Sequence, residues 1–135
     1  MNRTIKFRGK SIYGEDWLYG SLVKIEKDRY AVIPPLNNIE IGKSIGMYEV
    51  YPETVGQFTG LFDKNGKEIY EGDILHTITF GFEPEEYTAI ILYDNCRFQL
   101  SNGRNLFYFG QSDLTKMDDT IVIGNIYDNP ELIIP

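Results

Sequence analysis

The sequence has 135 residues, 42% hydrophobic and 14% aromatic, which is enough apolar material for one folded domain or two very small ones. Its formal net charge of −7 disfavours binding to nucleic acid or to anionic membranes, because both carry the same sign of charge. A single cysteine excludes an internal disulfide and no apolar run approaches the ~18 residues of a membrane span, so we expect a soluble cytoplasmic protein.

Short apolar runs follow one another along the chain, separated by Gly, Pro, Asn and Asp. This pattern is typical of many short antiparallel strands, and the high aromatic content favours strands as well. No long amphipathic helical repeat is present, so we expect an all-β fold. The expected strands, in chain order, are residues 4–8, 17–25, 29–33, 47–50, 69–80, 87–93, 96–100, 106–109 and 120–127.

Single helical turns are expected at residues 51–55, where Pro52 suits a first-turn position, and at 111–117. Prolines interrupt any strand ladder within residues 34–38 and 81–86, so both segments are expected to be loops.

Basic residues gather near the N-terminus at alternate positions, which would place them on one face of a strand. A positive stripe of this kind could contact nucleic acid, although a solvated edge strand, kept soluble by its charges, explains the pattern more simply. The residues are Arg3, Lys6, Arg8 and Lys10.

The segment Asp63-Lys64-Asn65-Gly66 predicts a hairpin turn in which Gly66 takes the left-handed conformation. A type I turn with a glycine bulge and a type I′ turn both fit, and Asp at the first position favours the former. A calcium-binding loop is excluded by spacing, because that loop requires glycine at its sixth position and glutamate at its twelfth.

Glu71-Gly72-Asp73 then leads into an alternating run, an arrangement common at the entry to small SH3-like barrels. We therefore expect an SH3-like, partly open barrel in the C-terminal half. The expected organisation is an N-terminal β subdomain, residues 1–57, and a C-terminal barrel subdomain, residues 58–135. One continuous globule remains the alternative.

The segments TVGQFTGL (residues 54–61) and DKNGKEIYEGDI (63–74) resemble the signature of the YopX family, small proteins encoded by phages and prophages. IKFR (5–8) is similar to the opening of the family sequence and IGNIYDNPEL (123–132) to its closing segment. The resemblance implies a β-rich fold and a phage or prophage origin, hence the cytoplasm of a host cell, but no established activity and no catalytic residues. The family-signature residues, to which we assign structural roles, are Gly60, Asp63, Gly66, Tyr70, Glu71, Gly72 and Asp73.

No residue pattern predicts a catalytic, cofactor or metal site. One histidine and one cysteine cannot assemble an ordinary zinc site, and Glu71 with Asp73 is better explained by turn formation than by acid/base catalysis. His76 is expected in a strand as a partly buried ring. Period-two counting places Cys96 on the same strand face as Phe98 and Leu100, so its thiol is expected to be unreactive.

Six aromatic residues could form a binding surface, although packing in the core is the simpler explanation. They are Trp17, Tyr19, Tyr30, Tyr48, Tyr51 and Tyr70. The leading hypothesis is an accessory protein without chemistry of its own that binds a host or phage protein or forms a homo-oligomer. The alternatives are a nucleic-acid-associated factor that uses the basic stripe, and an enzyme of unrecognised type.

Overall fold

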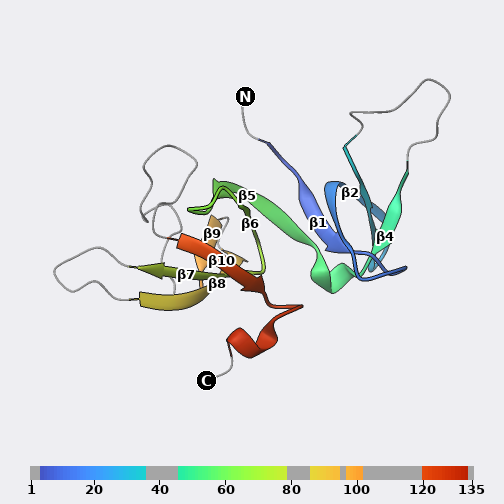
Figure 1. Cartoon of the computed structure of the whole chain (residues 1–135). Helices are drawn as coiled ribbons and strands as arrows, with labels where there is room; N and C mark the ends of the chain where they lie inside the picture. The colour runs from blue at the N-terminus through green and yellow to red at the C-terminus, as the bar shows by residue number, and fades with distance from the viewer. Residues whose placement is uncertain (1–3, 36–45, 79–85, 95–96, 102–119, 134–135) are drawn as a thin grey trace. The chain divides into compact units, whose positions relative to one another are not determined.

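The computed structural model describes residues 4–35, 46–78, 86–94, 97–101 and 120–133. The chain divides into two compact units, Met1–Phe58 and Thr59–Pro135, with the division falling inside one strand (Figure 1). Neighbouring strands pair antiparallel in both units, so the predicted all-β fold is confirmed.

A six-stranded sheet has the order β4-β3-β2-β1-β5-β6, and its strands β1 to β4 belong to the first unit. The short 3-10 helix η1 lies between β4 and β5, and Pro52 occupies its first turn, as predicted from the sequence. The elements are β1 (Phe7–Lys10), β2 (Trp17–Glu26), β3 (Arg29–Ile33), β4 (Tyr48–Val50), η1 (Pro52–Thr54) and β5 (Gly56–Phe62).

The sheet of the first unit closes on itself at one end. Ser11, which follows β1, forms a β-bridge with Val50 of β4, and the Tyr51 N–H donates to the Lys10 carbonyl at 2.8 Å. The inner face is tightly packed here, because a Cβ atom on Gly9 would lie only 2.7 Å from Cγ2 of Val50. Glycine at position 9 is therefore required by the close approach of two strands.

The second unit holds a four-stranded sheet in the order β10-β7-β8-β9, and β6 pairs with β5. Its elements are β6 (Glu68–Tyr70), β7 (Asp73–Ile78), β8 (Glu86–Asp94), β9 (Arg97–Leu100), β10 (Thr120–Asn125) and the 3-10 helix η3 (Pro130–Leu132). The core combines residues from all of these strands, with Phe98 packed against it. It consists of Leu61, Ile69, Leu75, Ala89, Ile91, Leu100 and Val122.

Two strand predictions need correction. The expected strand 69–80 is two strands, because Gly72 turns the chain with φ of +92° between β6 and β7. Strand β5 was not predicted, since Gln57, Thr59 and Gly60 dilute its apolar pattern. The SH3-like barrel stays a prediction. The expected strand 106–109, the expected turn 111–117 and Cys96 lie outside the described residues.

Candidate functional site

The signature residue Asp63 is buried at the start of the predicted hairpin turn. One carboxylate oxygen accepts hydrogen bonds from the N–H groups of Asn65 and Lys67, both at 2.8 Å. The other accepts from the Val122 N–H at 3.0 Å, so the turn is bonded to β10. Three backbone N–H groups thus donate to this carboxylate, which is the pattern expected of a residue with a structural role.

The turn itself has the geometry that Asp at its first position favours. The Gly66 N–H donates to the Asp63 carbonyl at 3.0 Å, and the Asp63 N–H donates to the Lys67 carbonyl at 2.8 Å. Gly66 has φ of +82°, which confirms the predicted left-handed conformation. The arrangement is a type I turn followed by a glycine bulge.

The second signature turn, at Glu71 and Gly72, is also tied to its surroundings. Asp73, which is buried, accepts a hydrogen bond from the Tyr70 N–H at 2.7 Å. The Gly72 N–H donates to the Ile91 carbonyl at 2.9 Å, and the Gly72 carbonyl accepts from the Ile126 N–H at 3.0 Å. This turn therefore joins β7, β8 and the chain after β10.

The remaining signature residues also lie in the second unit. The Tyr70 ring is buried and its hydroxyl donates to Glu68 at 3.2 Å, while Glu71 is half-buried. Gly60 has φ of +87° with open space around its Cβ position, so its backbone conformation, rather than packing, calls for glycine. The structure thus places all seven signature residues in or beside the β5–β6–β7 hairpins.

The part of the basic stripe on β1, Arg8 and Lys10, does not lie on an edge strand, contrary to expectation, and Arg3 lies outside the described residues. Strand β1 lies between β2 and β5, so both of its edges are paired (Figure 1). Arg8 is only 5% exposed, and its guanidinium carbon lies 4.7 Å from the centre of the Trp17 ring. The Lys6 ammonium lies 5.0 Å from the centre of the Phe58 ring. A sequence in which cations alternate along a strand does not distinguish an edge strand from a central strand whose cations pack on aromatic rings.

Several aromatic residues do gather on the same face as these cations. The strand register places Tyr19 opposite Arg8 and Trp17 opposite Lys10. The β-bridge between Ser11 and Val50 makes Tyr51 the next residue opposite Lys10, to whose carbonyl the Tyr51 N–H donates. Paired residues point to the same side of a sheet. We call the surface formed by Lys6, Lys10, Trp17, Tyr19 and Tyr51 the outer face.

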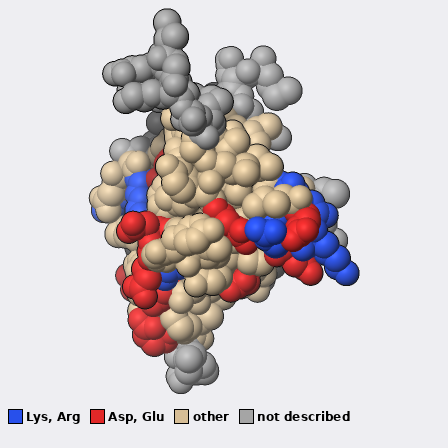
Figure 2. Space-filling model, turned by 90° about the vertical axis from the view of Figure 1, so that its right-hand side faces the viewer, with Lys and Arg blue, Asp and Glu red and all other residues tan. Residues whose placement is uncertain are grey.

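The outer face combines rings and charges at the surface of a rigid sheet. Tyr19 and Tyr51 are each 42% exposed, whereas the guanidinium of the buried Arg8 packs against the Trp17 ring. Figure 2 shows one side of the molecule, on which acidic and basic side chains gather in clusters beside uncharged residues. Of the other aromatic candidates, Tyr70 is buried in the second unit, and Tyr30 and Tyr48 lie on the opposite side of their sheet.

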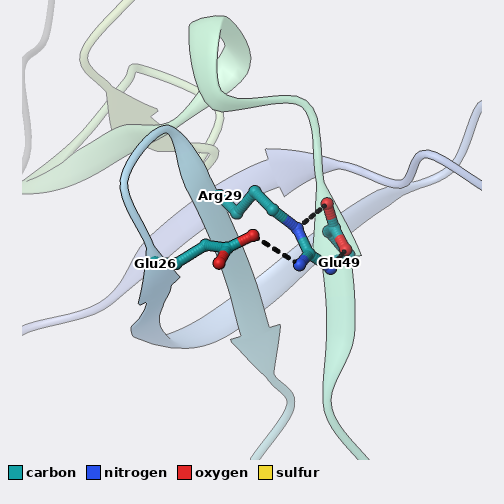
Figure 3. A network of polar contacts seen from close by, with 3 residues as sticks. All are labelled: Glu26, Arg29 and Glu49. Carbon is teal, nitrogen blue, oxygen red and sulfur yellow. Dashed lines mark hydrogen bonds and ion pairs between the residues drawn. The ribbon is translucent and has the colours of Figure 1, made fainter.

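A salt-bridge network fixes the β2–β3 turn of the first unit (Figure 3). Arg29 donates to Glu49 through two nitrogens, at 2.7 and 3.2 Å, and to Glu26 at 2.8 Å. These hydrogen bonds hold the pKa of Glu49 below its ordinary value and raise the pKa of Arg29. The network joins the turn to β4 through ion pairs at the protein surface, where such pairs contribute modestly to stability.

Other chemistry has little support among the residues with described positions. His76 lies in β7 as a partly buried ring, with Nε2 3.7 Å from a carboxylate oxygen of Glu86. No group of three or more His, Cys, Asp or Glu side chains in the described part of the chain could hold a metal ion. No helix in that part is long and apolar enough to span a membrane.

The structure is therefore that of an all-β protein in which the signature residues form and stabilise two turns, one between β5 and β6 and one between β6 and β7. A family model described as YopX protein matches residues 6–134, so the chain belongs to the YopX family. The crystal structure of protein EF1440 from Enterococcus faecalis is similar, with a TM-score of 0.63 and 29% identity, over 98% of this chain and 100% of that one. No curated protein matches the chain.

Proposed function

We propose that this chain is a phage or prophage accessory protein of the host-cell cytoplasm that acts by binding a protein partner on the outer face. The observation that carries the proposal is the exposure of Tyr19 and Tyr51 beside Trp17 on one face of a sheet. Large aromatic side chains at the centre of a patch supply much of the binding energy of protein interfaces.

The outer face is also prepared for binding. The Arg8 guanidinium supports the Trp17 ring from beneath, and the ring is held before any partner arrives. Pairing of β1 on both edges fixes the positions of the side chains that project from it. Little conformational entropy would therefore be lost at these positions on binding.

The alternatives have weaker support. A nucleic-acid interface requires accessible cations. Arg8 is almost fully buried, and among the described residues 4–10 the other two cations, Lys6 and Lys10, are half-buried. An enzyme requires titratable groups directed at a substrate, whereas the buried carboxylates of Asp63 and Asp73 are directed at backbone N–H groups.

Affinity capture from host cells, followed by mass spectrometry, tests the proposal. Tyr19→Ser removes an exposed ring from the outer face, and Tyr13→Ser removes a ring that is 80% exposed in the β1–β2 loop. We expect the wild-type protein and Tyr13→Ser to capture the same partner and Tyr19→Ser to lose it, with all three showing the same thermal unfolding. Equal capture by Tyr19→Ser would refute the outer face as the docking surface.

A further inference from the structure

The two units carry very different charges. Residues 1–58 contain eight Lys and Arg against seven Asp and Glu, whereas residues 59–135 contain five against thirteen. The first unit therefore has a net charge of +1 and the second a net charge of −8. A separation of this kind makes the second unit of one molecule electrostatically attractive to the cations on the first unit of another.

The second unit also presents an exposed sheet face. Leu75, Ala89 and Val122 pair across β7, β8 and β10 and point into the core. The neighbouring positions Ile121, His76 and Thr88 pair with one another in the same register, so they lie on the opposite side of the sheet.

This opposite side is accessible and carries negative charge. Ile121 is 37% exposed, Thr88 is exposed, and the exposed carboxylate of Glu86 lies beside His76. We call the surface formed by His76, Glu86, Thr88 and Ile121 the second-unit face. It offers an apolar side chain and a carboxylate, which complement the rings and ammonium groups of the outer face.

We propose that the partner on the outer face is a second copy of this chain, which docks through its second-unit face. The inference rests on the proposed function, because it assigns the occupant of the same outer face. In this arrangement Tyr19 and Tyr51 of one copy cover Ile121 of the next, and Lys6 and Lys10 approach Glu86. The interface joins two different surfaces and is heterologous, so each copy can bind one neighbour on each side.

Sedimentation equilibrium of the wild-type protein is the first test. We expect an average mass above the 15.6 kDa monomer that rises with protein concentration. Because the attraction is partly electrostatic, association should weaken about tenfold between about 0.05 M and about 0.5 M NaCl. A single monomeric species at about 100 µM protein would overturn the inference, because any self-association would then have a dissociation constant of about 1 mM or larger.

A pair of variants separates a heterologous interface from a symmetric one. Tyr19→Glu places a carboxylate on the outer face and Ile121→Lys places a cation on the second-unit face, so each protein alone should be monomeric. Mixed together, they should form a two-chain complex, because each retains the surface that the other has lost. Tyr13→Ser is the matched control and should keep the wild-type mass.

Each remaining outcome decides the question. If Ile121→Lys alone keeps the wild-type mass, or if the mixture stays monomeric while wild type associates, the second-unit face is not used and the inference is wrong. Circular dichroism verifies that both variants are folded, and Tyr51→Glu replaces Tyr19→Glu if the latter is not. A monomeric wild type that still captures another protein through Tyr19 would remove this inference and leave the proposed function standing.

Discussion

A carboxylate oxygen of Asp63 accepts a hydrogen bond at 3.0 Å from the N–H of Val122, 59 positions further along the chain. Next to it, the Lys64 N–H donates to the Thr120 carbonyl at 2.9 Å. A turn that reads as a local feature in the sequence therefore also pairs with the outer edge of β10, and β10 pairs with β7 on its other side. The family signature marks a point at which two distant segments are joined.

Replacing Asp63 by Ala should destabilise the protein by about 3 kcal/mol, because three backbone N–H groups lose their acceptor and the Val122 N–H is buried. Urea unfolding followed by circular dichroism measures the loss. Lys64→Ala, at an exposed position of the same turn, should change stability by less than about 0.5 kcal/mol. Equal stability of the two variants would show that the carboxylate is not structural.

Gly66→Ala should lower stability by about 1 kcal/mol, the cost of the left-handed conformation for a residue with a Cβ atom. Space is not the cause, since nothing lies within 4 Å of the added atom. Gly66→Asn should recover part of the loss, because Asn tolerates this conformation better. Gly9→Ala should cost more than Gly66→Ala, because its Cβ would press against Val50. The reverse order in chemical denaturation would contradict this account.

The salt bridge between Arg29 and Glu49 predicts a specific pH dependence. The pKa of Glu49 is lowered in the folded protein, chiefly by the hydrogen bond from Arg29, so the stabilisation is present above the ordinary glutamate pKa and is lost as the pH falls through the folded-state pKa. Glu49→Gln should therefore unfold at a lower urea concentration than wild type at pH ~7, and this difference should narrow as the pH falls below ~4, the ordinary range of a glutamate pKa. A gap that persists at acidic pH would mean that charge is not the cause.

Sequence reasoning succeeded where one residue fixes the backbone locally. The range of β3 was predicted to the residue, because a turn residue precedes it and a proline follows it. Asp28, just before the strand, takes a φ of +59° in the turn, and Pro34 follows its last residue. The η1 turn followed from Pro52, and the hairpin turn followed from Gly66. In each case the constraint lies within four residues of the element that it determines.

The outer face could not be predicted in the same way. Alternation placed Lys6, Arg8 and Lys10 on one side of a strand, but the rings that they pack on belong to other strands. Which strand pairs with β1 depends on the whole fold, and so does its place inside the sheet rather than at its edge. The hydrogen bond from the Val122 N–H to the Asp63 carboxylate could not be predicted for the same reason.

Random duplex DNA should show no measurable binding at physiological salt. The net charge of −7 opposes the release of counterions that drives such binding, and Arg8, the central cation of the expected stripe, is covered. Filter binding at two salt concentrations measures the affinity. Micromolar binding that weakens steeply with salt would show that the remaining N-terminal cations act on phosphates, and Lys6 and Lys10 would then be the first residues to replace.

The single tryptophan of the chain provides a direct optical test of the outer face. Trp17 packs against the buried Arg8 and shares a face of β2 with the exposed Tyr19, so a partner that covers this face should reduce the access of water to its ring. Wild-type fluorescence should shift to shorter wavelength, and acrylamide should quench it less, as protein concentration rises through the range in which the mass increases. Ile121→Lys, which replaces no residue of the outer face, should keep the spectrum of the dilute protein at every concentration. If the mass increases while the Trp17 spectrum stays constant, the copies associate through another surface, and the outer face must be assigned to a different partner.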